Sequence, residues 1–473
     1  MNPKYSRRRF LGQLSCAAIG SNTLLNTINN LNLFNTIAAK RALFNNDYKA
    51  LVCVLLLGGS DSFNMLVPRG DAEYSEYAIA RGSLALDKNT LLPITPKTSD
   101  GKTYGLHPSL SRTKVLFDDG KAALIANVGT LHEPTDKDDY DNGSNLPLGL
   151  FSHSDQQRQW QTSLPLDRKT IGWGGRMADV LASTNENSNI SMNISLAGNS
   201  IFLSGNSTIN YVISHQENPG LNICGSSGII ALPLNRPDFH ARRDGIGNLL
   251  AADYENLLHL TYRNTIRGAQ EKHEEFSGAI KAVNLINPIT SDSFSFGDRL
   301  KMVAKTIASR ERLNMNRQVF LVSFGGWDHH DEVLNNQASM LNILDRGLSE
   351  FYTVLEELEV ADKVTTFTAS EFGRTLTSNG NGSDHGWGGN CMVIGGAVNG
   401  NDIYGSYPDL FLGSNLDVGR GRLIPTMATD EYFAELALWF GIDKTELALV
   451  LPNIGNFYNI ANSTQPVGFM NLT

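Results

Sequence analysis

The run Leu51-Val52-Cys53-Val54-Leu55-Leu56-Leu57, followed directly by Gly58-Gly59-Ser60-Asp61, decides the fold of this chain. A short, unbroken apolar run that ends at a glycine turn is typical of a strand buried on both faces of a parallel sheet. The two glycines let the backbone leave the strand tightly, so we expect Asp61 at the strand's carboxyl end, where a carboxylate can hold a metal ion. An aspartate that caps the next segment is an equally good interpretation.

Other apolar runs predict further strands, at residues 122–128, 319–324, 364–369 and 391–394. Between the second and third of these, residues 340–358 carry apolar side chains near helical spacing. A strand, helix, strand order implies a right-handed parallel crossover. Helices are also predicted at residues 251–275, 298–312 and 431–440. The predicted class is α/β, with a doubly wound and mostly parallel sheet.

The N-terminus predicts export. Ser6-Arg7-Arg8-Arg9-Phe10-Leu11 fits the twin-arginine pattern, and a moderately apolar run at residues 11–19 follows it. Ile37-Ala38-Ala39 offers a cleavage site, so residues 1–39 are predicted to be a twin-arginine signal peptide and residues 49–473 the mature domain. No other segment reaches the roughly 18 unbroken apolar residues of a membrane span. The expected location is periplasmic or secreted, reached in the folded state.

The composition is that of a soluble globular protein. With 473 residues, 41% hydrophobic and 18% charged, the chain can bury a large core as one domain or as one domain with an insertion. Residues 183–236 are rich in Asn, Ser and Gly with short β-like pieces, which predicts a β-rich insertion or cap. A net charge of -9 argues against nucleic acid as a partner, because phosphate backbones select basic surfaces.

Three short clusters gather carboxylates and imidazoles: Gly326-Trp327-Asp328-His329-His330, Ser370-Glu371-Phe372-Gly373-Arg374 and Ser383-Asp384-His385-Gly386. Asp, Glu and His bind divalent ions, and clusters that end predicted strands can converge at one edge of a sheet. Alternate residues of an extended segment share a face, so Asp328 and His330 are expected to reach one ion while His329 points away. A histidine-rich surface loop is the alternative.

The other two clusters suggest a metal ligand and an anion site. Arg374 is a natural bidentate partner for an oxyanion or for Glu371 itself, and a plain structural ion pair stays open. Asp384 and His385 lie in a loop of Asn, Gly and Ser that is costly to order unless something such as a metal holds it.

A hydroxyl group is also well placed along the chain. Ser152 precedes a polar stretch, residues 156–162, that can open a helix. Helix N-termini favour anions, so Ser152 could act as a nucleophile beside a bound phosphate or sulfate. Ordinary capping by Ser152 or Ser154 is the alternative.

Together these pieces resemble the exported proteins called domain of unknown function 1501, placed in the alkaline phosphatase and sulfatase-like superfamily. The resemblance covers residues 51 to about 442. Besides the clusters above, it rests on residues 58–64, Val67-Pro68, Leu106-His107-Pro108, Ser152-His153, Trp160-Gln161-Thr162 and Gly172-Trp173-Gly174-Gly175-Arg176.

The resemblance implies a hydrolase with two divalent ions at the carboxyl edge of the sheet and a Ser, Thr or modified Cys as nucleophile. It assigns Asp61 and Glu371 to one ion, Asp328, His330 and His385 to the other, and Ser152 as nucleophile with Ser62 as competitor. Arg374 or Arg176 would steady the developing charge.

This sequence departs from the superfamily in its ligands. The histidine usually follows the aspartate by four residues, whereas His330 follows Asp328 by two, and a later Asp-His pair is replaced by Glu371-Phe372. Phe372 cannot bind a metal. The second site is therefore short of a ligand, and Asp384, His153 or water would have to fill it. The implied cofactor is one or two divalent ions, with zinc, manganese and calcium all open.

Two functions follow from these expectations. One is a metal-dependent hydrolase of phosphate or sulfate esters outside the cytoplasm, acting on a small anionic ester. The other is a catalytically silent binding or assembly protein on the same fold, with a polysaccharide-linked ligand as one option. Metal stoichiometry separates them, and the oligomeric state stays open.

Overall fold

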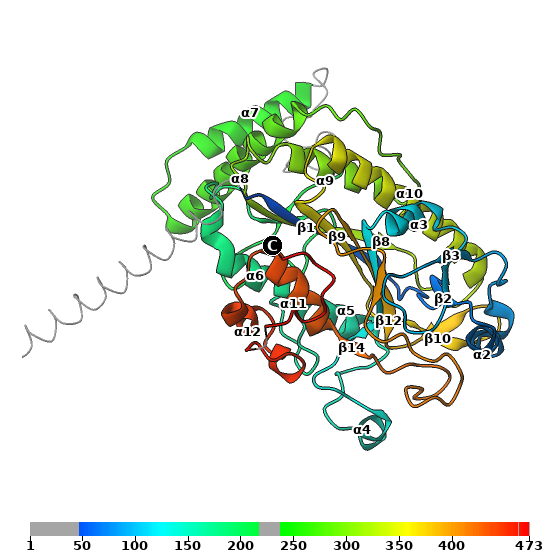
Figure 1. Ribbon diagram of the computed structural model, residues 1–473. Coiled ribbons are helices and arrows are strands. Elements are labelled where there is room, and N and C mark those ends of the chain that lie inside the picture. Colours follow the sequence, from blue (N-terminus) through cyan, green and yellow to red (C-terminus); the bar gives the residue numbers. More distant parts are fainter. Residues whose placement is uncertain (1–46, 217–236, 462, 473) are drawn as a thin grey trace, which may run out of the picture.

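The protein is described by a computed structural model that covers residues 47–216, 237–461 and 463–472, with only the backbone for 237–243 (Figure 1). The predicted signal peptide, residues 1–39, lies outside the described residues. Among the helices of the described ranges, none has both the length and the apolar character needed to cross a membrane.

A large mixed sheet forms the centre of the molecule. Its strands lie in the order β13 (Asp402–Tyr404), β5 (Ala122–Gly129), β12 (Gly389–Gly395), β9 (Val364–Ala369), β1 (Lys49–Leu57), β8 (Arg317–Gly325), β6 (Asn193–Ser195) and β7 (Tyr211–Val212), with β14 (Met427–Ala428) also on β5. All neighbours pair in parallel except β12, which is antiparallel to both β5 and β9. The five predicted strands are confirmed as β1, β5, β8, β9 and β12, and the sheet is mostly parallel.

Side chains of β1 enter two separate cores, which explains its unbroken apolar sequence. Ala50, Val52, Val54 and Leu56 belong to one core, and Leu51, Cys53 and Leu55 belong to the other. Burying one such Val or Leu side chain stabilises the fold by about 1.5–3 kcal/mol. Both faces of the strand are therefore core, as expected for a parallel sheet covered on two sides.

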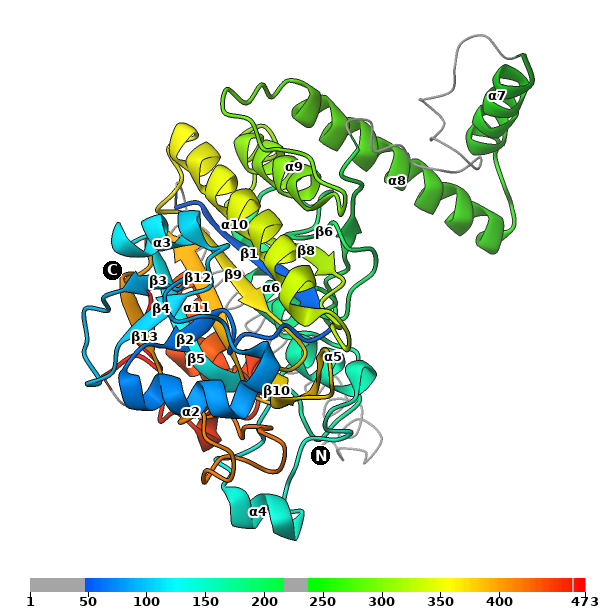
Figure 2. The same cartoon turned by 90° about the vertical axis from the view of Figure 1, so that its right-hand side faces the viewer.

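Helices cover both faces of the sheet (Figures 1 and 2). The first core includes residues of α3 (Ser111–Asp118), α9 (Phe296–Ala308) and α10 (Val333–Glu357). The second includes residues of α5 (His153–Thr162), α6 (Trp173–Leu181), α11 (Thr429–Phe440) and α12 (Leu447–Val450). Further elements are α2 (Asp71–Arg81), α4 (Lys137–Asn142), a small sheet of β2 (Leu66–Pro68), β4 (Tyr104–Leu106) and β3 (Leu92–Ile94), and the hairpin of β10 (Arg374–Ser378) and β11 (Ser383–His385).

One predicted helix has different bounds in the structure. The helix expected at 251–275 is α8 (Leu257–Lys281), because Asn256 caps it by accepting from the N–H groups of Leu258 and His259. It follows α7 (Pro237–Ala251), and in Figure 2 both helices extend away from the sheet. The described part of the region expected to be a β-rich insertion or cap contributes β6 and β7, which extend the main sheet beside β8; residues 217–236 lie outside the described residues.

The carboxyl ends of β1, β8 and β9 lie side by side and position the site. Leu57 pairs with Gly325 and Leu55 with Ala369, so the segments that follow these three strands leave the same edge of the sheet. The β10–β11 hairpin then brings the third cluster back, with Arg374 opposite His385. The predicted convergence of the clusters at one sheet edge is therefore a consequence of strand register.

Candidate metal centre

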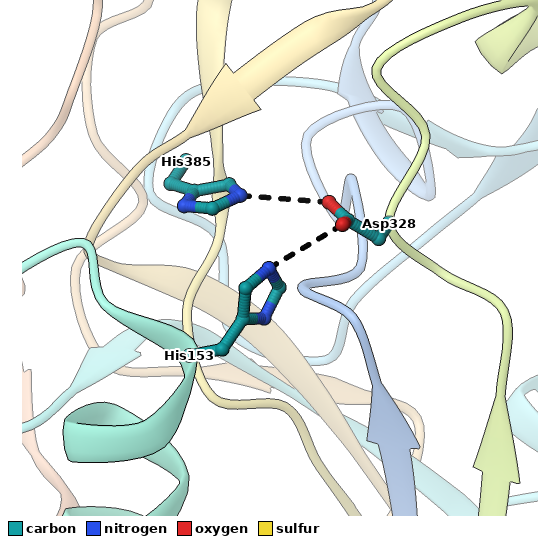
Figure 3. Close-up of side chains that lie close together, drawn as sticks. All are labelled: His153, Asp328 and His385. Carbon is teal, nitrogen blue, oxygen red and sulfur yellow. Dashed lines mark ion pairs between the residues drawn. The ribbon is translucent and has the colours of Figure 1, made fainter.

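Three side chains from distant parts of the chain meet at this edge. One ligand atom each of His153, Asp328 and His385 lies within 4.8 Å of the other two (Figure 3). His153 Nε2 is 3.4 Å from Asp328 Oδ2, and His385 Nε2 is 3.5 Å from Asp328 Oδ1. His153 is the first residue of α5, Asp328 follows β8, and His385 ends β11.

A third imidazole touches two members of this group. His330 Nε2 lies 3.0 Å from Asp328 Oδ1 and 3.0 Å from His385 Nε2. His329, which lies between Asp328 and His330 in the sequence, is buried, and its Nδ1 has no protein partner. It lies outside the group, as the alternation of side chains along an extended segment predicts.

All three imidazoles are oriented through their other ring nitrogen. The Nδ1 contacts are His153 to Glu371 Oε1 at 2.9 Å, His330 to Asp384 Oδ1 at 3.2 Å, and His385 to the Phe151 carbonyl at 2.7 Å. Because carboxylates and carbonyls only accept, each Nδ1 carries the proton and the lone pair of the neutral ring is on Nε2. This is the arrangement in which outer oxygens orient histidines that bind a metal.

These lone pairs make the group a good fit for a cation. Two acceptor nitrogens 3.0 Å apart, both close to the Asp328 carboxylate, repel one another unless a positive charge lies between them. Zinc bonds of about 2.0–2.1 Å place tetrahedral ligands about 3.3 Å apart, close to the spacings observed. The donor set therefore suits a divalent ion.

Charge and burial prepare two of these ligands. Burial by itself would raise the pKa of Asp328. A hydrogen bond from Arg374 at 2.5 Å and the nearby His330 and His153 nevertheless hold this pKa below its ordinary value. Burial, with Arg374 and His153, lowers the pKa of His385 against the opposing Phe151 carbonyl and Asp328. Both shifts favour the forms that bind metal, a carboxylate and a neutral imidazole.

Phe372 supports the imidazoles although it cannot bind an ion. Its ring stacks on His385 with centroids 4.5 Å apart and lies 4.9 Å from the His153 ring. Gly59 leaves room for it, because a Cβ at that position would lie 2.2 Å from Phe372 Cε2. Where the superfamily pattern has a metal-binding histidine, this chain has Phe372, which packs against the imidazoles of the cluster.

The structure places the other predicted ligands around the cluster. Glu371 is fully buried, and besides His153 its Oε1 accepts from the Gly58 N–H at 2.8 Å and from Gln157 Nε2 at 2.9 Å. Asp384 accepts from His330, from Asn379 at 3.0 Å and from Arg420 at 2.6 Å. Both carboxylates contact imidazoles of the cluster and orient them.

Asp61 lies apart from the cluster. It is 1% exposed, and its Oδ2 forms an ion pair with Arg81 of α2, which is fully buried. Gln337 Nε2 donates to the Asp61 backbone carbonyl at 2.6 Å. At the end of β1, where we expected a carboxylate that can hold a metal ion, Asp61 has a guanidinium on one of its two oxygens.

The two arginines expected to steady charge are engaged in the fold. Arg374 donates to the Gly59 carbonyl at 2.7 Å and the Ser383 carbonyl at 2.9 Å, in addition to Asp328. The nitrogens of Arg176 donate to backbone carbonyls: Nε to Val450, Nη1 to Ile171 and Nη2 to Thr162. Arg374 thus joins β11 to the segments that follow β1 and β8, whereas the contacts of Arg176 lie in α5, in α12 and in the segment that precedes α6.

The two candidate nucleophiles differ in accessibility. Ser152 precedes His153 at the start of α5 without capping the helix, and its half-exposed hydroxyl lies 3.1 Å from the Ser154 hydroxyl. Ser62 is buried, and its hydroxyl accepts from the Asn390 N–H at 2.7 Å. Of the two, only Ser152 can meet a substrate from solvent.

His153 is the functional residue that the sequence indicated least. It was expected only as a substitute ligand, because a single His after a Ser carries no metal-ligand spacing. The available signal was its position at the start of a predicted helix, next to Ser152. Its role becomes visible through Glu371, which is distant in sequence and adjacent in space.

Comparisons with known proteins place the chain in a sequence family and give weak structural likenesses. A family model described as "Protein of unknown function (DUF1501)" matches residues 48–446. No curated protein matches the chain in sequence. The crystal structure of Ps i-CgsB in complex with k-i-k-neocarrahexaose has 10% identity and a TM-score of 0.32, covering 87% of this chain and 77% of that one. A mutant of alkaline phosphatase PafA has 12% identity and a TM-score of 0.24, covering 69% and 63%.

Proposed function

The chain belongs to the DUF1501 family of proteins of unknown function, and from its site we propose that it is a metal-dependent hydrolase of phosphate or sulfate esters that acts outside the cytoplasm. The observation that carries the proposal is the convergence of imidazole Nε2 atoms on the Asp328 carboxylate, each ring being oriented through Nδ1. A bound divalent ion supplies a Lewis acid for the ester oxygen and lowers the pKa of a bound water.

The residues of the site suit this chemistry in two ways. The side chains of Asp328 and His330 are 45% and 44% exposed, so an ester can reach the cluster from solvent. The surrounding loops are cross-linked through Arg374, which keeps the ligands in place before an ion or a substrate arrives. The hydrolase class itself comes from the resemblance of the motifs.

Ser152 is the proposed nucleophile. It is adjacent to His153 in the chain and lies at the N-terminus of α5, where the helix dipole favours an anionic group. Its hydroxyl contacts only other polar groups of the same turn, so it is available for attack on phosphorus or sulfur. Metal-activated water is the alternative nucleophile, and Ser152→Ala separates the two.

An exported binding or assembly protein is the second candidate. It is favoured by the engagement of Arg176 and Arg374 with backbone carbonyls, because hydrolysis of an anionic ester requires positive charge at the transition state. In that case the ion would hold the loops together or bind an anionic ligand.

The test is metal content together with turnover. Protein exported by its native route would be analysed by mass spectrometry for metal and assayed on phosphate and sulfate monoesters and diesters, beside Asp328→Ala and His385→Ala. His259→Ala, which removes an exposed histidine of α8, is the matched control. Bound metal and turnover that disappear in the two site variants and persist in the control would establish the hydrolase. Bound metal without turnover on any ester would favour the binding protein, and protein without metal would refute the site.

A further inference from the structure

The two carboxylates that the resemblance assigns to a second ion are already in use. Asp61 and Glu371 are 1% and 0% exposed. Asp61 Oδ2 is paired with the fully buried Arg81, and Glu371 Oε1 accepts the three hydrogen bonds that orient His153 and fix the Gly58 turn. One oxygen of each carboxylate is therefore engaged by the protein itself.

Arg81 is held in place from its other side as well. Its Nη1 donates to the Thr375 carbonyl at 3.0 Å, in the strand that follows the Glu371 cluster. A guanidinium keeps its charge at all physiological pH values, and buried charges are only weakly screened. A divalent ion on Asp61 would therefore lie next to a permanent positive charge.

The remaining oxygens of this pair lack further ligands. Asp61 Oδ1 and Glu371 Oε2 are buried without a protein partner. Among the described residues, ligand atoms of His153, Asp328 and His385 lie within 4.8 Å of one another, and His330 contacts two of these residues. Neither Asp61 nor Glu371 belongs to that group of three. Asp61 Oδ1, whose carboxylate is paired with Arg81, and the single unpartnered oxygen of Glu371 are a poor site for a divalent ion and are suited to an internal water.

We infer that this protein has a one-ion centre of the zinc class, with Arg81 in place of a second cation. The ligands are His153, Asp328, His385 and, as the fourth, His330. Three imidazole nitrogens and one carboxylate oxygen are the ligands of zinc and neighbouring late transition ions, whereas calcium and manganese prefer sites dominated by oxygen. The inference depends on the proposed metal-dependent function in one respect, which is that the protein binds a metal ion at all.

The decisive measurement is the binding stoichiometry of the full exported chain. Metal would be removed with a chelator and returned as Zn²⁺, Co²⁺, Mn²⁺ or Ca²⁺ under equilibrium dialysis, with the visible spectrum of Co²⁺ as a second readout. We expect one equivalent of Zn²⁺ or Co²⁺ with a tetrahedral or five-coordinate Co²⁺ spectrum, and at least 100-fold weaker binding of Ca²⁺. His330→Ala is expected to weaken Zn²⁺ binding at least tenfold, and unchanged affinity would remove His330 from the ligand set.

A double variant tests the role of the ion pair between Asp61 and Arg81. Asp61→Asn with Arg81→Gln removes both charges together, so neither is left buried alone. We expect it to bind one equivalent, as the parent does. Two equivalents in the parent would overturn the inference. Because this result is measured on the parent, it stands even if the double variant fails to fold.

The outcomes also separate this inference from the proposed function. One equivalent with no turnover on any ester would sink the hydrolase and leave the one-ion centre standing. Two equivalents with turnover would overturn the one-ion centre and leave the hydrolase. Absence of binding by any of the ions would overturn both.

Discussion

Replacing Glu371 by glutamine is expected to weaken metal binding while leaving the fold intact. Glu371 Oε1 accepts three hydrogen bonds, from Gly58 N–H at 2.8 Å, Gln157 Nε2 at 2.9 Å and His153 Nδ1 at 2.9 Å. A glutamine keeps one oxygen for these donors and places its amide nitrogen where Glu371 Oε2 has no protein partner. The shape and the three hydrogen bonds to Oε1 are preserved, the negative charge is lost, and the new amide N–H groups have no acceptor in the protein.

The loss of charge acts on the metal through His153. A neutral acceptor pulls less on the Nδ1 proton, so Nε2 becomes a weaker ligand. Outer-sphere partners of this kind typically change metal affinity by about 10- to 100-fold, which corresponds to about 1.4–2.7 kcal/mol. The metal-free protein is expected to lose about 1–3 kcal/mol, because removal of a buried charge offsets the weaker hydrogen bonds but the new amide donors are buried without an acceptor.

The assay is competition with a zinc chelator, combined with denaturant unfolding of the metal-free protein. Glu371→Ala is the contrast, because three unpaired donors at about 1 kcal/mol or more each should destabilise the fold by at least about 3 kcal/mol. Glu357→Gln is the matched control: Glu357 accepts three hydrogen bonds from Ile286 and Asn287, away from the cluster. An unchanged zinc affinity in Glu371→Gln would refute the orienting role of this carboxylate.

Four other outcomes are expected. Gly59→Ala should destabilise the protein by about 2–4 kcal/mol and reduce metal content, because its Cβ would lie 2.2 Å from Phe372 Cε2 at a φ of +83°; thermal unfolding with metal analysis checks this, and an unaltered melting temperature would contradict it. Burial raises the pKa of Asp430 to about 7 from its ordinary 3.8. A raised pKa in the folded state gives stability that is present below about pH 4 and is lost as pH rises through about 7. Asp430→Asn should therefore become more stable relative to the parent by up to about 4 kcal/mol between pH 4 and 8. A difference in unfolding free energy between variant and parent that is the same at all pH values would argue against it. Replacing Arg7 and Arg8 by lysine should leave the protein in the cytoplasm, as measured by cell fractionation, and normal export would show that another route is used. A centre with one divalent ion should favour esters that carry one negative charge, sulfate monoesters and phosphate diesters, over phosphate monoesters, which carry nearly two at pH 7; a higher kcat/KM for phosphate monoesters would count against this.

The fold could be predicted in large part because its strands are locally encoded. The run 51–57 is apolar at every position because both of its faces enter a core, and the buried strand 364–369 is built of Val, Phe, Ala and β-branched Thr. The sequence of β12 carries no such signal for its direction, so its antiparallel pairing appears only in the structure. The short strands β6 and β7 also lacked a signal that they extend the main sheet, because their partners are β8 and each other.

The candidate site was predictable where its residues are close in sequence. Asp328 and His330 alternate on one extended segment, and His385 follows Asp384 in a polar loop, so their chemistry could be read from local pattern. The sequence could not show which of these carboxylates would bind the ion and which would orient a histidine. That distinction depends on which nitrogen of a distant histidine each carboxylate faces.

By itself, the amino-acid sequence determined the mostly parallel sheet, the edge at which polar side chains gather and the residue types available there, because apolar periodicity and glycine turns act locally. Only the tertiary structure decided the composition of the centre. It brought His153 from the start of α5 to Asp328, turned Glu371 into the acceptor for that histidine, and paired Asp61 with Arg81. These contacts join segments from different parts of the chain, and strand register and helix packing set their distances rather than any spacing in the sequence.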